Sequence, residues 1–193
     1  MRTVYELQLG LGVRGFYLLV VGVVAVALVV LRLLERRGHR ATARTLAWAL
    51  FLVALAAVLW ATLRPFVPWG TGQSRLILDP VRGIEGWAGS VAWRPVVNNV
   101  GLFIPLGALA AAALPRVGRM RLWVGLVALS VGIETVQYLV PSGRVANTAD
   151  VLANAIGAAL GLLLHAVLAP RRGAGPAPPR TSPAWSARPD RAA

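Results

Sequence analysis

Polar side chains that could do chemistry stand inside otherwise apolar stretches in the second half of the chain. One is a glutamate, one is an aspartate and the others are amides. A carboxylate can act as an acid, a base or a ligand, and an amide can both donate and accept hydrogen bonds. Because such groups are costly in hydrocarbon, their concentration there indicates a functional site. The candidates are Asn98, Asn99, Glu134, Gln137, Asp150 and Asn154.

Glu134 is the most informative of these candidates. Ser130 lies four residues before it and Gln137 three residues after it, so the three side chains share one helical face. We expect Glu134 to be an acid, a base or a ligand-binding carboxylate, because packing alone does not justify the cost of an acid in the middle of a span. The alternative is a structural role as the partner of Arg144 or Gln137.

A second face follows in the next apolar stretch. Spacings of four, three and four residues separate Asp150, Asn154, Gly157 and Gly161. The two glycines form a GxxxG pair that lets a neighbouring helix approach closely, so we assign them a packing role. Asp150 suits a helix cap as well as a ligand contact. For the amides, hydrogen bonds between helices are the alternative to ligand binding.

The elements that must position these groups are five apolar stretches of 18 to 20 residues. A helix needs about 20 apolar residues to cross a bilayer, and a mean hydropathy of +0.66 is too apolar for a soluble domain of this size. We therefore predict an all-α fold, a polytopic helical membrane bundle with about five transmembrane helices. The spans are Phe16–Leu34, Leu46–Leu63, Val96–Leu114, Leu122–Val140 and Ala149–Leu168.

One further helix is predicted outside the bilayer, in the loop between the second and third spans. Asp79 is a good N-cap and Pro80 suits the first helical position. Apolar residues then recur at helical spacing as far as Val91. We expect a short helix on the outer membrane surface, with an irregular loop anchored by tryptophans as the alternative.

The chain divides into an N-terminal segment (1–15), a membrane domain (16–168) and a tail (169–193). The tail is rich in proline and lacks apolar periodicity, so we expect it to be disordered. Arginines gather in the loop Glu35–Arg44, in the turn Pro115–Arg121 and in this tail. The positive-inside rule makes their common side the cytoplasm, which places the N-terminus outside and the C-terminus inside.

Composition excludes several classes of protein. The chain has no cysteine, which excludes disulfides, thiol catalysis and cysteine-based metal centres. Its two histidines lie far from the polar candidates, which argues against a histidine metal site, so we expect no metal and no cofactor. The net charge of +13 comes from 20 arginines that mostly flank the spans, where they contact lipid headgroups. We therefore exclude nucleic acid as a partner.

Depth distinguishes a pocket from a transport pathway. Glu134 and Asn154 both lie roughly 9–10 Å below the outer turn. Above them stands Arg144, whose forked guanidinium could bind a phosphate or a carboxylate or contact lipid headgroups. The inner parts of the last three spans carry no ionisable residue, whereas a pathway needs polar groups through most of the membrane. These inner parts are Leu106–Leu114, Leu122–Leu129 and Ala155–Leu164. We expect an outward-opening pocket, and a kink at Pro105, next to Gly107, that tilts the third span towards it.

The same residues carry a resemblance to a known family. The chain contains the stretches NVGLFIPLG (Asn99–Gly107), ETVQ (Glu134–Gln137), Arg144 and DVLANAIGAALG (Asp150–Gly161) in this order. In these motifs and their spacing it resembles the VanZ-like family over about Asp79–Leu164. The resemblance implies a bacterial, multi-span membrane protein of the cell envelope, in a family whose namesake is associated with resistance to the glycopeptide teicoplanin. The first two spans carry no motif of the family.

The first functional hypothesis is a binding protein. The outward pocket would take a lipid-linked glycan, a cell-wall intermediate or a glycopeptide. Arg144 would meet an anionic group, while the carboxylates and amides would bond hydroxyls or amides of the ligand. Membrane lipids are further expected partners. A second copy of the chain is another, because the first two spans lack polar features.

Two alternatives come from other functional classes. One is an intramembrane hydrolase or transferase acting on a lipid-linked substrate, with Glu134 and Asp150 as acid and base or with oxygen ligands around Mg²⁺ or Ca²⁺. The other is a proton-coupled transporter that uses Glu134. The absence of a cysteine and of a Gly-x-Ser-x-Gly motif leaves the enzyme without an obvious nucleophile, so we favour binding over catalysis.

Overall fold

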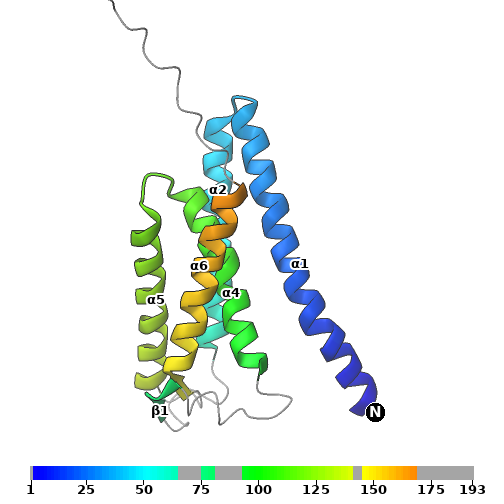
Figure 1. Ribbon diagram of the computed structural model, residues 1–193, viewed down its shortest axis with the longest axis vertical. Helices are drawn as coiled ribbons and strands as arrows, with labels where there is room; N and C mark the ends of the chain where they lie inside the picture. Colours follow the sequence, from blue (N-terminus) through cyan, green and yellow to red (C-terminus); the bar gives the residue numbers. More distant parts are fainter. Residues whose placement is uncertain (1, 65–74, 81–92, 141–144, 169–193) are drawn as a thin grey trace, which may run out of the picture.

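The computed structural model describes residues 2–64, 75–80, 93–140 and 145–168. Side chains are described from Leu19 onwards in the first of these ranges and from Val96 onwards in the third. Long helices make up almost all of this part, which confirms the all-α membrane bundle (Figure 1). In chain order the elements are α1 (Arg2–Arg36), α2 (Arg40–Leu63), β1 (Arg75–Ile77), α4 (Trp93–Ala113), α5 (Arg119–Leu139), β2 (Val145–Asn147) and α6 (Thr148–Leu168).

Four helices of the described part are long and apolar enough to cross a membrane. They correspond to the last four predicted spans, and they are Arg40–Leu63, Val96–Ala113, Arg119–Leu139 and Thr148–Leu168. The first predicted span lies within α1, whose 35 residues are roughly 50 Å long against a hydrocarbon core of about 30 Å. These helices identify the chain as a multi-pass membrane protein.

The helices alternate in direction, so the bundle has two chemically different ends (Figure 1). The α1–α2 turn, the α4–α5 turn and the last turn of α6 lie together, and we name this the arginine-rich end. The ends of α2 and α5, the starts of α4 and α6, and both strands lie at the opposite end, the strand end. Because of this alternation, the two arginine-rich turns, Glu35–Arg44 and Pro115–Arg121, lie at the same end of the bundle, as predicted.

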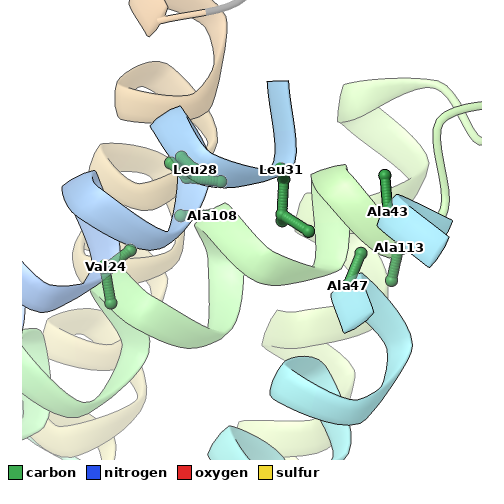
Figure 2. Packing of buried hydrophobic residues seen from close by; sticks show 7 residues of the cluster. All are labelled: Val24, Leu28, Leu31, Ala43, Ala47, Ala108 and Ala113. Atoms are coloured by element: carbon green, nitrogen blue, oxygen red, sulfur yellow. The ribbon is translucent and has the colours of Figure 1, made fainter. Parts of the chain in front are cut away.

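The helix α1 packs on the bundle through its C-terminal half and leans away from it towards the N-terminus (Figure 1). Three large side chains of this half, Val24, Leu28 and Leu31, are buried. They pack against small residues of α2 and α4, which lets the helices come close (Figure 2). These small residues are Ala43, Ala47, Ala108 and Ala113.

The closest helix contact joins α4 to α6 and depends on glycines. A Cβ added to Gly107 of α4 would stand 2.5 Å from the carbonyl oxygen of Ala158 in α6. A Cβ on Gly157 would strike the carbonyl oxygen of Val100, and one on Gly161 that of Ile104. Only residues without a Cβ allow two backbones this close, which is how small residues favour helix association in membranes.

Two strands were not predicted from the sequence. β1 and β2 pair in parallel, with Arg75 opposite Val145 and Ile77 opposite Asn147. Three residues are too few for the alternating pattern that identifies a strand, so the pairing has no sequence signal of its own. α4 continues as one helix through Pro105, and the kink there stays a prediction. Of the predicted surface helix, residues 81–91 lie outside the described residues.

We predict that Gly161→Ala destabilises the bundle, because the new methyl group meets backbone that cannot move aside. The expected loss in the free energy of unfolding is about 1–3 kcal/mol, measured by detergent-induced unfolding followed by tryptophan fluorescence. Gly132→Ala in α5 is the control, since nothing lies within 4 Å of its Cβ position. It should be neutral or stabilising by up to about 1 kcal/mol. Equal losses in both variants would contradict the packing argument.

Candidate functional site

Glu134 lies buried near the end of α5, with 9% of its surface exposed. Its Oε2 accepts a hydrogen bond from the backbone N–H of Asn147 at 2.8 Å. Asn147 is the last residue of β2, opposite Ile77 of β1. A carboxylate that accepts a backbone N–H makes a stronger bond than a neutral acceptor. The acid therefore holds the strand pair to the end of the bundle.

Asn147 was missed by the sequence analysis, although it is 3% exposed and central to the site. Its Oδ1 accepts the backbone N–H of Ala149 at 3.0 Å, so its side chain acts as the N-cap of α6. The sequence analysis considered Asp150 for capping. In the structure Asp150 is the third residue of α6 and half-buried, where a carboxylate is stabilised by the helix dipole. Asparagine just before the apolar run was the available signal.

A second contact fixes the strand pair to α6. The hydroxyl Oγ1 of Thr148 lies 2.8 Å from the carbonyl oxygen of Ile77 and 2.6 Å from that of Leu78. One hydroxyl hydrogen is shared between these two acceptors, because threonine carries a single O–H donor. The loop that contains β1 is thereby joined to the first residue of α6, beside the N-cap.

Gln137 connects α5 to α2. It is 7% exposed, and its Nε2 donates to the carbonyl oxygen of Thr62 at 2.8 Å. α2 ends at Leu63, so this carbonyl is one of the last four, which have no partner within their own helix. The amide predicted as a ligand contact thus satisfies the end of a neighbouring helix, which was its structural alternative.

Asn154 and Ser130 form the deepest polar contact of the site. Asn154 is 2% exposed and Ser130 is fully buried, and Nδ2 of Asn154 donates to Oγ of Ser130 at 2.9 Å. This bond joins α5 to α6, two helices that run in opposite directions. Within the described residues, the Oδ1 of Asn154 is buried without a hydrogen-bond partner. A buried acceptor of this kind is costly unless a donor reaches it.

The other predicted residues lie on different elements of the chain. Asn98 and Asn99 lie in the first half of α4, on the strand end, and both are half-buried. Arg144 lies outside the described residues. The helix face predicted for α6 divides in the structure, because Asn154 contacts α5 while Gly157 and Gly161 contact α4. In the described residues, no three acidic or histidine side chains come together in a group that could hold a metal ion.

We predict that Gln137→Ala weakens the attachment of α2 by leaving the Thr62 carbonyl without its donor. The expected cost is about 1 kcal/mol, between the average for hydrogen bonds in membranes and that of a buried unsatisfied group. Detergent-induced unfolding of the purified chain measures it. Thr135→Val is the control, because this exposed hydroxyl bonds only within its own helix, to the carbonyl oxygen of Val131. Unchanged stability in Gln137→Ala would contradict the assignment.

Comparison with known protein families assigns residues 18–169 to VanZ/LLP1. Comparisons with curated proteins and with solved structures give no match. The assigned region contains the four motifs noted in the sequence. It also includes α2 and the second half of α1, where the sequence carried no recognisable motif. Because the match extends over most of the chain, this membrane protein belongs to the VanZ/LLP1 family.

Proposed function

We propose that this chain is a bacterial cell-envelope protein whose polar site at the strand end binds an amphipathic headgroup. The ligand would be a lipid-linked glycan, a cell-wall intermediate or a glycopeptide, and a contribution to glycopeptide resistance is one outcome of such binding. The observation that carries the proposal is the buried Oδ1 of Asn154, which has no hydrogen-bond partner in the described residues.

The chemistry of the site favours a ligand rich in hydrogen-bond donors. The Oδ1 of Asn154 needs an N–H or O–H group, and leaving such an acceptor unsatisfied costs about 1–3 kcal/mol. Glu134 adds a carboxylate, a group that accepts hydrogen bonds, as its Oε2 does from the backbone N–H of Asn147. Sugar hydroxyls, acetamido groups and peptide amides supply such donors. Glycans and glycopeptides carry them at high density.

The surroundings of the site favour a ligand that is held in the membrane. One face of α6 presents large apolar side chains to the outside of the bundle, where lipid is the expected solvent. These side chains are Leu152, Ile156, Leu160 and Leu163. A lipid-linked ligand could therefore place its chain along this face and its headgroup at the strand end, which keeps both parts in favourable surroundings.

Binding is tested with the purified full-length chain, using labelled teicoplanin and an undecaprenyl-diphosphate-linked disaccharide peptide as probes. We predict that Asn154→Leu, which has nearly the same shape, lowers the affinity for the bound probe roughly tenfold by removing the acceptor. Ser130→Ala is the matched control, because it breaks the same α5–α6 bond and keeps the Oδ1 of Asn154. It should bind within twofold of wild type. Wild-type affinity in a folded Asn154→Leu variant would contradict the proposal.

The proposed orientation places the strand end outside, because the arginine-rich end belongs in the cytoplasm by the positive-inside rule. The chain has no cysteine, so single-cysteine variants report cleanly. We predict that a membrane-impermeant maleimide labels Val145→Cys in intact cells. Met120→Cys, at the other end, should react only after permeabilisation. Both positions are exposed. The reverse pattern would invert the orientation and remove the proposed site from the cell exterior.

A further inference from the structure

A second site lies at the arginine-rich end, on the opposite side of the bundle from the polar site. A cavity of about 710 Å³ opens there between α1, α2, α4 and α6. This volume is in the range of pockets that hold small molecules, and it exceeds the space that a single inorganic ion requires. Among the described residues, four arginines and one glutamate line it, and their charges sum to +3.

The hairpin of α1 and α2 brings these arginines together. Arg32 and Arg36 are four residues apart on α1, and Arg40 and Arg44 are four residues apart on α2, so each pair occupies one face. Gly38 makes the tight connection with a φ of +88°, a conformation that other residues rarely adopt. The turn therefore places the two pairs around one space, although no local pattern of the sequence links them.

Arg32 is held in position by the neighbouring helix. It is half-buried, and its Nη2 donates to the carbonyl oxygen of His165 at 3.2 Å. This carbonyl is one of the last four of α6, which lack partners in their own helix. A guanidinium has five N–H donors in a fixed plane, and this bond uses one of them. Its planar fork suits the oxygens of a phosphate.

The walls below the arginines are apolar. Leu28 and Leu31 of α1, with Ala43 and Ala47 of α2, line the cavity on the side of the bundle core. Towards the membrane, α1 exposes Val29 and other large apolar side chains. A charged region above apolar walls matches an amphiphile whose phosphate meets arginines and whose glycerol and first methylene groups contact leucine and alanine. A soluble anion would use only the charged half.

His165 adds a polar contact inside this space. Its side chain lines the cavity, and its Nδ1 is buried without a hydrogen-bond partner in the described residues. A neutral imidazole nitrogen can accept a hydrogen bond or donate one, depending on its tautomer. A hydroxyl group on the bound headgroup would satisfy this atom whichever tautomer is present, since a hydroxyl can do both.

We propose that this cavity binds the phosphate headgroup of an anionic membrane lipid. Basic pockets between membrane helices are suited to such headgroups, and the cavity lies at the end that the positive-inside rule assigns to the cytoplasm. The bound lipid bridges α1 to α2, α4 and α6, and offsets the mutual repulsion of the arginines. The site is separate from the polar site at the strand end, so neither proposal depends on the other.

The test is native mass spectrometry of the purified full-length chain in micelles, titrated with phosphatidylglycerol. Arg36→Gln/Arg40→Gln removes two exposed cavity arginines, and Arg116→Gln/Arg121→Gln removes two exposed arginines of the same end that do not line the cavity. Each arginine near a membrane surface raises the affinity for an anionic lipid about fivefold. Because the cavity variant lacks two of them, its affinity for the first bound lipid should be roughly 30-fold lower. The control variant should stay within threefold of wild type, and phosphatidylcholine should bind weakly to all three.

Two results would overturn the proposal. Equal losses in both double variants would mean that the lipid follows the general positive charge of this end and not the cavity. Inorganic phosphate that displaces phosphatidylglycerol at comparable concentration would mean that the ligand is a soluble anion. Glu35→Gln serves as a second check, because it predicts a gain in lipid affinity, and a misfolded variant would not show a gain. It removes the one carboxylate that lines the cavity in the described part of the chain, so it should tighten lipid binding several-fold.

Discussion

The contact between α4 and α6 is the constraint on which the rest of the bundle depends. Gly107, Gly157 and Gly161 let the two backbones come within a distance that any Cβ would prevent. This contact fixes the rotation of α6 about its own axis, because its glycine face must meet α4. Asn154, three residues before Gly157, then faces α5 and Ser130. The close packing of the α6 glycines against α4 thus decides the direction in which Asn154 points.

The polar groups at the strand end join neighbouring elements of the bundle through hydrogen bonds. Gln137 satisfies the end of α2, Asn147 caps α6, and Glu134 holds the backbone of Asn147. Within a membrane, groups of this kind must find partners inside the protein, because water is not available to them. Within the described residues, the Oδ1 of Asn154 is a buried acceptor without a partner, and in the proposed function a ligand supplies its donor. A network of satisfied groups gives this atom a fixed position, which favours selective binding.

The two ends of the molecule present opposite chemistry to the two membrane surfaces. The strand end carries buried oxygen acceptors, for which we propose a ligand with hydroxyl or amide donors, whereas the arginine-rich end carries guanidinium donors, for which we propose an anionic lipid. A bound lipid at the arginine-rich end would set the position of α1, whose described side-chain contacts with the bundle lie in its C-terminal half. Because α1 and α6 both border this cavity, its occupancy would also act on the helix that carries Asn154.

The sequence by itself determined the all-α membrane fold, the positions of the last four spans, the GxxxG pair of Gly157 and Gly161, and the family to which the chain belongs. These depend on local periodicity, on span length and on short motifs, all of which can be read along the chain. Only the tertiary structure decided the partners: Gln137 meets Thr62, which is 75 residues away, and Arg32 meets His165, which is 133 residues away. It also assigned the cap of α6 to Asn147, paired two strands too short to show a pattern, and gathered the arginines of one hairpin around a cavity. Partner choice between distant residues depends on how helices pack, and helical periodicity fixes only the face on which a side chain stands.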